Sequence, residues 1–182
     1  KMILKYLSRS YIKPTKISTI KCGYLTEKSF ARISNNYTCP VLIKGFMIDA
    51  PALKNWTLDY LNTCIDKDFK INCISNDNNE VQIIPLTFSE FMDKKEGNIY
   101  INNNHTLLSH FTQLFNDIKQ RFLLLKCILY RIPKHIHIAN LFIGYGKNKG
   151  SHLHCGGSGN FFTQIKGKKH WTFIDPKYSC LL

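Results

Sequence analysis

Residues 150–176 read Gly150-Ser-His-Leu-His-Cys-Gly-Gly-Ser-Gly-Asn-Phe-Phe-Thr-Gln-Ile-Lys-Gly-Lys-Lys-His-Trp-Thr-Phe-Ile-Asp-Pro176. The second half of this stretch predicts two strands, at 160–165 and 170–174, joined by a hairpin turn. Ahead of them, His152 and His154 lie two positions apart, and on a strand this spacing points both imidazoles to one face. Two neutral imidazoles on one face are a plausible part of a site for a first-row transition metal. The alternative is a pair of histidines that face solvent.

The rest of the chain is predicted to contain short helices and strands. Strands are predicted from apolar runs and alternation at 40–45, within 62–73, at 99–101 and at 136–143. Helices are predicted from capping and turn signals at 26–33, 50–61, 87–92 and, mixed with loop, within 105–129. The first strand should be buried and end at Gly45, and Thr87 with Glu90 should form a capping box. This order favours a β-barrel or sandwich core with helices outside.

The composition indicates a globular chain with a basic surface. Of the 182 residues, 44% are hydrophobic and 13% aromatic, which is enough for one domain with a core and argues against disorder. The formal net charge of +13 is strongest in an irregular basic lead-in at residues 1–24. Such a surface could attract nucleic acid, anionic lipid or acidic protein, or it could be a solvated tail. No motif supports nucleic-acid binding, and no run of apolar residues is long enough to span a membrane.

The cysteines and sequons leave the compartment open. Seven cysteines without a C-x-x-C spacing predict reduced thiols rather than a disulfide scaffold or a zinc ribbon, which favours the cytoplasm or nucleus. Glycosylation sequons at Asn36, Asn55 and Asn104 keep an ER or secretory route open. The chain begins with Lys1 rather than Met, so we expect that the natural start lies upstream.

Several of these segments together resemble a known family. The spacing from Gly146 through His152 and His154 to Asn160 and Gly167 is similar to the first cupin motif. The longer stretch 139–176 resembles the JmjC/cupin-like 2-oxoglutarate-dependent oxygenases, and most of all their factor-inhibiting-HIF-like branch. Three upstream segments resemble the N-terminal region of that branch in the same order, at 40–46, 50–57 and 86–91.

The resemblance covers residues 25–182 and implies a fold class. It is mainly β with flanking helices: a partial double-stranded β-helix, or cupin/JmjC barrel, preceded by an α/β N-terminal region. The domain would be incomplete at its C-terminus, because the family's second metal-binding histidine would lie beyond Leu182.

The resemblance also implies Fe(II) and 2-oxoglutarate as cofactors. The family holds iron with two histidines and one carboxylate, and its H-x-D motif falls on His154 and Gly156, so that the acid is missing. His152 could replace it as a ligand. Without a replacement, metal affinity should fall.

Four residues match the family's positions around 2-oxoglutarate. The resemblance implies that Lys169 binds its far carboxylate, that Ser151 and Tyr100 hydrogen-bond the same group, and that Asn160 lies near metal and cosubstrate. A cation suits that place because it pairs with a fixed dianion in a dry pocket. The alternatives are a turn lysine, a loop hydroxyl, a core tyrosine and a turn asparagine.

The function implied is that of an enzyme. We expect the full-length protein to be an Fe(II)/2-oxoglutarate-dependent dioxygenase, a hydroxylase that acts on a side chain of a protein or peptide substrate. Because Gly156 replaces the acid, two alternatives stay open: a catalytically inactive cupin-like binding domain and a halogenase-like variant in which a halide fills the vacant position. The sequence does not predict an oligomeric state.

Overall fold

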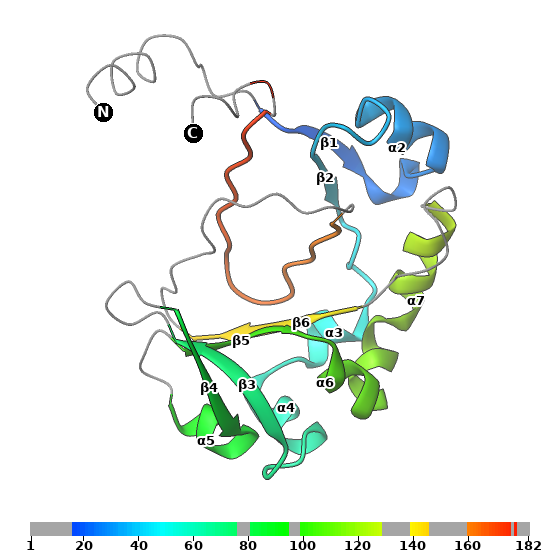
Figure 1. The fold of residues 1–182 in the computed structure, drawn as a ribbon. Coiled ribbons are helices and arrows are strands. Elements are labelled where there is room, and N and C mark those ends of the chain that lie inside the picture. The colour runs from blue at the N-terminus through cyan, green and yellow to red at the C-terminus, as the bar shows by residue number, and fades with distance from the viewer. Residues whose placement is uncertain are drawn as a thin grey trace, which may run out of the picture. The chain divides into compact units, whose positions relative to one another are not determined.

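The fold is that of a computed structural model, which describes residues 16–75, 81–94, 99–128, 139–145, 160–175 and 177 (Figure 1). The chain divides into two compact units. The first comprises residues 1–46 and 167–182, and the second comprises residues 47–166. A two-stranded sheet lies in the first unit and a four-stranded sheet in the second.

The first unit is built around two parallel strands and a capped helix. Strand β1 (Ser18–Lys21) pairs with β2 (Val41–Lys44), and the 3-10 helix η1 (Cys22–Tyr24) and helix α2 (Glu27–Ile33) lie between them in the chain. Helix α2 begins at Thr26, whose Oγ1 accepts a hydrogen bond from the Ser29 N–H at 3.0 Å. The Ser29 hydroxyl in turn accepts from the Thr26 N–H at 2.8 Å. These bonds satisfy two N–H groups that a helix start leaves open, and they confirm the capped helix predicted there.

Two predictions for this unit need correction. The strand predicted at 40–45 exists and ends at Gly45, which has φ +73°, but it alternates between half-buried and exposed residues, with Leu42 52% exposed. Strand β2 therefore has one half-buried face and one exposed face, since successive side chains of a strand point to opposite faces. The basic lead-in is also not irregular throughout, because β1 lies within it. The boundary at residue 25 stays a prediction.

The second unit contains an antiparallel sheet in the order β4-β3-β5-β6. Its strands are β3 (Lys70–Ser75), β4 (Gln82–Thr87), β5 (Ile99–Asn104) and β6 (Leu141–Gly144). In the register, Cys73 pairs with Ile84 on one side and with Ile101 on the other, and Ile101 pairs in turn with Ile143. Strand β4 is an end strand of this sheet and contains Pro85, a residue confined to edges because it lacks an N–H group.

Among the described residues of this unit, five helices accompany the sheet: α3 (Pro51–Asn55), α4 (Leu58–Cys64), α5 (Phe88–Asp93), α6 (His105–His110) and α7 (Thr112–Ile128). In Figure 1, α4, α5 and α6 lie below β5 and β6. Their apolar residues pack with one face of the strands into a core. Its members without measurable exposure are Ala52, Cys73, Phe88, Phe91, Ile101, Leu107 and Leu114. The core therefore lies between one face of the sheet and the helices.

The start of α5 confirms a local prediction. The Thr87 hydroxyl accepts from the Glu90 N–H at 3.2 Å, and the Glu90 carboxylate accepts from the Thr87 N–H at 2.7 Å. This is the capping box that the sequence predicts. The Thr87 hydroxyl also lies 3.1 Å from this carboxylate and donates to it, and the hydrogen bonds from the Thr87 N–H and hydroxyl lower the pKa of Glu90.

The last two predicted strands are wrong. Neither 160–165 nor 170–174 is a strand, and β6 is the last strand of the described residues. The boundary between the two compact units falls between Lys166 and Gly167, inside the predicted hairpin. Alternation of apolar residues reports the surroundings of side chains, and it does not require backbone pairing with a partner strand. Gly167 still makes the turn, with φ +77°.

The fold class is confirmed in part. Strands form sheets with flanking helices, and helices precede β3, as the α/β N-terminal region requires. The described residues contain no closed barrel, since β4 and β6 are the two ends of the four-stranded sheet. The double-stranded β-helix therefore stays a prediction.

Candidate functional site

Three of the six predicted site residues lie among the described residues. Tyr100 and Asn160 belong to the second unit and Lys169 to the first. The other three, Ser151, His152 and His154, lie outside the described residues, as does Gly156.

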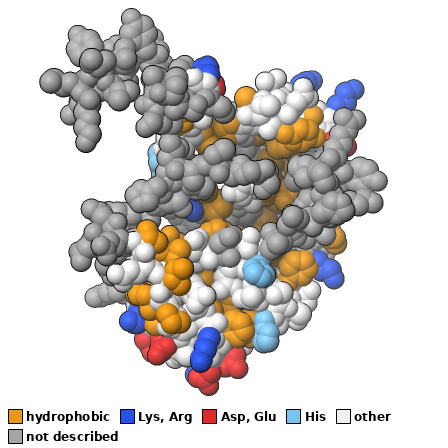
Figure 2. Space-filling view, viewed as in Figure 1, with side chains coloured by type: hydrophobic (Ala, Val, Ile, Leu, Met, Phe, Trp, Pro, Cys, Tyr) orange, Lys and Arg blue, Asp and Glu red, His pale blue; other side chains and the backbone are white. Residues whose placement is uncertain are grey.

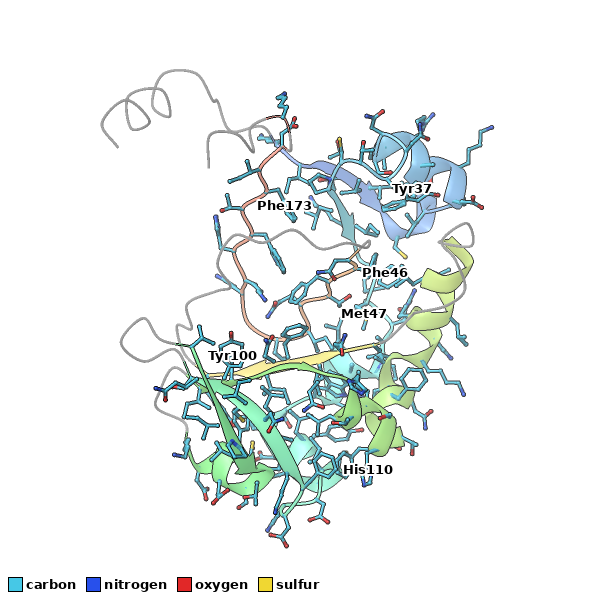
Figure 3. The ribbon with its side chains drawn as sticks, in the orientation of Figure 1. Tyr37, Phe46, Met47, Tyr100, His110 and Phe173 are labelled. Carbon is cyan, nitrogen blue, oxygen red and sulfur yellow. The ribbon has the colours of Figure 1, made fainter. Side chains whose placement is uncertain are left out.

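Tyr100 projects from the sheet face opposite the helical core. It is the second residue of β5, where it pairs with Ile74 of β3 and with Gly144 of β6. Its neighbour Ile101 is fully buried in the core, and successive side chains of a strand point to opposite faces. Figure 3 accordingly shows Tyr100 on the side of β5 away from α4 and α6. The half-buried phenol is therefore not part of the helix-facing core, which was the alternative for this residue.

We call this side of the sheet the outer face, defined by Ile74, Ile83, Tyr100 and Phe142. These residues pair across the strands or alternate with core residues. Ile83 is 70% exposed and Phe142 is 43% exposed, whereas Ile74 and Tyr100 are half-buried. Figure 2 shows hydrophobic side chains at the surface of the described residues. Tyr100 pairs with Gly144 of β6, and because glycine has no side chain, this partner places none beside the phenol.

The segment that contains Asn160 contacts the outer face. The ring of Phe162 lies against Phe142, with centroids 6.2 Å apart and ring planes at 62°. Phe142 is two residues from Gly144, the strand neighbour of Tyr100. Asn160 is two residues before Phe162 and is exposed. The second unit thus places Asn160 on a segment that packs onto the same face as Tyr100, while its role near a cosubstrate stays a prediction.

Lys169 lies against an aromatic ring in the first unit. Its Nζ is 4.7 Å from the centroid of the Trp171 ring. Trp171 stacks in turn on Phe173, with centroids 5.9 Å apart and ring planes at 9°. Burial lowers the pKa of the Lys169 ammonium, although the residue as a whole is exposed. A partly desolvated ammonium suits the binding of a carboxylate, because the pair is screened less than in bulk water.

A metal centre is not assembled by the described residues. They contain no group of three or more histidine, cysteine, aspartate or glutamate side chains that could hold a metal ion. The imidazole of His110, labelled in Figure 3, belongs to no such group. It packs on Phe69 and Phe111, at centroid distances of 5.0 and 4.9 Å. The predicted ligands His152 and His154 lie elsewhere in the chain, so the iron site and its donors stay a prediction.

The family follows from a comparison with known domains. A model described as the cupin-like domain matches residues 28–182, which is most of the chain. The chain belongs to the cupin-like domain family. No curated protein matches it. This superfamily includes 2-oxoglutarate oxygenases, so the match agrees with the resemblance at the level of the family. The factor-inhibiting-HIF-like branch stays a prediction.

One polar cluster of the cupin-like domain was not predicted. The carboxylate of Asp117 in α7 is buried and accepts two hydrogen bonds on Oδ2, from Trp56 Nε1 at 2.9 Å and from the Tyr60 hydroxyl at 2.7 Å. Gln113 donates to the same hydroxyl at 3.3 Å. Burial and the hydrogen bond to Asp117 raise the pKa of Tyr60 to about 12. These contacts join α7 to the region of α3 and α4.

The cluster gave no signal in the sequence because its members are far apart in the chain. Asp117 is 61 residues from Trp56 and 57 residues from Tyr60. A carboxylate on an amphipathic helix is indistinguishable by pattern from a solvated one. The Asp117 carboxylate is buried and accepts hydrogen bonds from two donors, which identifies it as a structural link between helices.

No helix of the described residues is long and apolar enough to cross a membrane. The partners predicted for the chain, a protein or peptide substrate, remain a proposal.

Proposed function

We propose that the full-length protein is an Fe(II)/2-oxoglutarate-dependent oxygenase that hydroxylates a side chain of a protein or peptide. The observation that carries the proposal is the position of Tyr100. In a chain of the cupin-like family, a half-buried phenol projects from the sheet face opposite the helical core. A phenol there can donate a hydrogen bond to a carboxylate, which is the role that the resemblance implies.

The residues of this chain would divide the binding of the cosubstrate between them. The resemblance implies a positive charge from Lys169 and a hydroxyl donor from Tyr100, and both types of group bind carboxylate oxygens well. Ser151 is proposed as a second hydroxyl donor and Asn160 as a polar neighbour. His154, with His152 as the further candidate, would hold the iron, which supplies the oxidative chemistry when it is bound.

One feature of the sequence favours a different function. Gly156 stands where the family has its metal-binding acid, which removes one charge and one bond from the metal. A catalytically inactive cupin-like domain that binds a partner is therefore the second candidate. A halogenase-like reaction is the third, and it would show as a requirement for chloride.

Succinate release by the full-length protein tests the oxygenase proposal. With Fe(II), 2-oxoglutarate and oxygen, we expect succinate to form in a reaction that requires added iron and is lost in His154→Ala. The matched control is His105→Ala, because this histidine is exposed at the start of α6 and is not a predicted metal ligand. Release that persists in His154→Ala at the unchanged rate would contradict the proposal.

Binding of 2-oxoglutarate tests the role of Tyr100 separately. Tyr100→Phe should weaken it about tenfold or more, because a hydrogen bond to a charged group contributes about 1.5–3 kcal/mol. Tyr24→Phe is the control, since this tyrosine is 72% exposed. Equal affinities of all three proteins in calorimetry would remove Tyr100 from the site.

A further inference from the structure

Three alternating residues of the first unit form a short stack. Lys169, Trp171 and Phe173 are each two positions apart, so in an extended segment their side chains project to the same side. The Lys169 Nζ lies 4.7 Å from the Trp171 ring centroid, and the indole lies nearly parallel to the Phe173 ring, at 9°. Trp171 is 39% exposed and Phe173 is 54% exposed. The Lys169 ammonium therefore contacts the Trp171 ring, and the Phe173 ring stacks on the same indole.

This contact bears on how a lysine can receive an anion. A lysine side chain has four flexible carbon–carbon bonds, and fixing it costs conformational entropy. The face of an indole attracts a cation, and an ammonium that is already placed loses less freedom when an anion arrives. An ammonium has three N–H donors, so contact with a ring on one side is compatible with a carboxylate on another.

We propose that Trp171 is the positioning residue for Lys169: its ring holds the ammonium where a carboxylate is received, and Phe173 fixes the plane of that ring. The identity of the carboxylate as 2-oxoglutarate rests on the proposed function. The role of Trp171 itself rests on the geometry of the stack. In this role, Trp171 contributes to the affinity of Lys169 for the anion.

Nuclear magnetic resonance of the full chain tests the placement. In protein labelled at the lysine ε-carbon, the Lys169 signal is assigned with Lys169→Arg. We expect the attached protons to be shifted upfield by the indole ring current. The shift should be lost in Trp171→Leu and largely kept in Trp171→Phe, because only the latter retains a ring.

Titration with 2-oxoglutarate tests the consequence. Trp171→Leu should bind about two- to fivefold more weakly than the unchanged chain, the effect expected for one exposed cation–π contact. Trp171→Phe should restore most of the affinity. Lys168→Met is the control, and it should change neither the ring-current shift of Lys169 nor the affinity.

The outcomes separate this inference from the proposed function. A Lys169 signal without an upfield shift, or equal affinity of Trp171→Leu and the unchanged chain, would overturn the role of Trp171. If the unchanged full-length protein does not bind 2-oxoglutarate, the proposed function fails. Even then, the ring-current shift and its dependence on Trp171 test the placement of the Lys169 ammonium, because this measurement does not require 2-oxoglutarate.

Discussion

At the residue level, burial shifts the pKa of two side chains. It lowers the pKa of Lys169 and, together with the hydrogen bond to Asp117, raises the pKa of Tyr60 to about 12. In both residues burial favours the neutral form. For Lys169 the charged form is the one that a carboxylate requires, so the proposed binding should depend on pH.

The affinity for 2-oxoglutarate should fall as the pH rises through the lowered pKa of Lys169. Only the protonated ammonium pairs with the carboxylate, and binding must raise the pKa of Lys169 again, so protons are taken up on binding at high pH. Calorimetry from neutral pH to pH 10.5, the ordinary lysine pKa, measures both effects. In Lys169→Met this dependence should disappear, whereas in Lys168→Met it should persist. The same pH dependence in all three proteins would exclude Lys169 as its source.

Asp117 should be important for stability rather than for the proposed chemistry. Asp117→Ala removes the acceptor of Trp56 and Tyr60, and each buried donor left without an acceptor costs about 1–3 kcal/mol. Asp117→Asn keeps one side-chain oxygen and should lose less. Urea denaturation measures the free energy of unfolding. Asn116→Ala is the control because Asn116 is an exposed neighbour in the same helix. A loss no larger in Asp117→Ala than in this control would contradict the tie between helices.

At the level of elements, the four-stranded sheet has two unlike faces. One packs on the helices through residues such as Ile101, and the outer face includes Ile83, which is 70% exposed. Both are isoleucines in strands of the same sheet. Their difference in burial gives a direct test of the assignment of the faces.

Ile101→Ala should lower the free energy of unfolding by about 2–5 kcal/mol, because it leaves a cavity in the packed core. Ile83→Ala should change it by only about 0.5 kcal/mol, the size usual for surface substitutions. Urea denaturation of the two variants makes the comparison. Similar losses in both would mean that the outer face is buried as deeply as the helical face.

The sequence predicted those elements that local signals specify. Thr87 and Glu90 cap α5 through contacts three residues apart, and such contacts can be read along the chain. The cluster around Asp117 could not be read, because it joins residues about sixty positions apart. The predicted strands at 160–165 and 170–174 failed for a related reason, since their alternation gave the side-chain pattern without a partner strand. In the site, the structure places Tyr100 on the sheet face opposite the helical core, while the role of each site residue stays a prediction.

At the level of the whole molecule, one family extends over both compact units. The cupin-like domain covers residues 28–182, whereas the division by contacts assigns 1–46 and 167–182 to one unit and 47–166 to the other. The first and last segments of the family domain thus belong to the same unit. The predicted iron ligands near Gly156 belong to this family region as well.

Placing an acid at position 156, where the resemblance implies one, tests whether that region can bind a metal. Gly156→Asp should strengthen the binding of Mn(II) to the full-length protein by at least about tenfold, since even groups outside the ligand set alter metal affinity by about 10–100-fold. Calorimetry with Mn(II) under anaerobic conditions measures this. Gly157→Asp adds the same charge one position away and should have little effect. An equal gain in both variants would indicate a nonspecific effect of charge.

Pro85 has a consequence for how molecules of this protein meet at high concentration. An end strand offers open backbone groups to which a neighbouring chain can add, and a row of exposed apolar residues encourages such growth into fibres. Because proline has no N–H group, β4 cannot offer an unbroken row of donors, although Ile83 in the same strand is exposed. We expect that replacing this proline would make fibril formation by this strand easier.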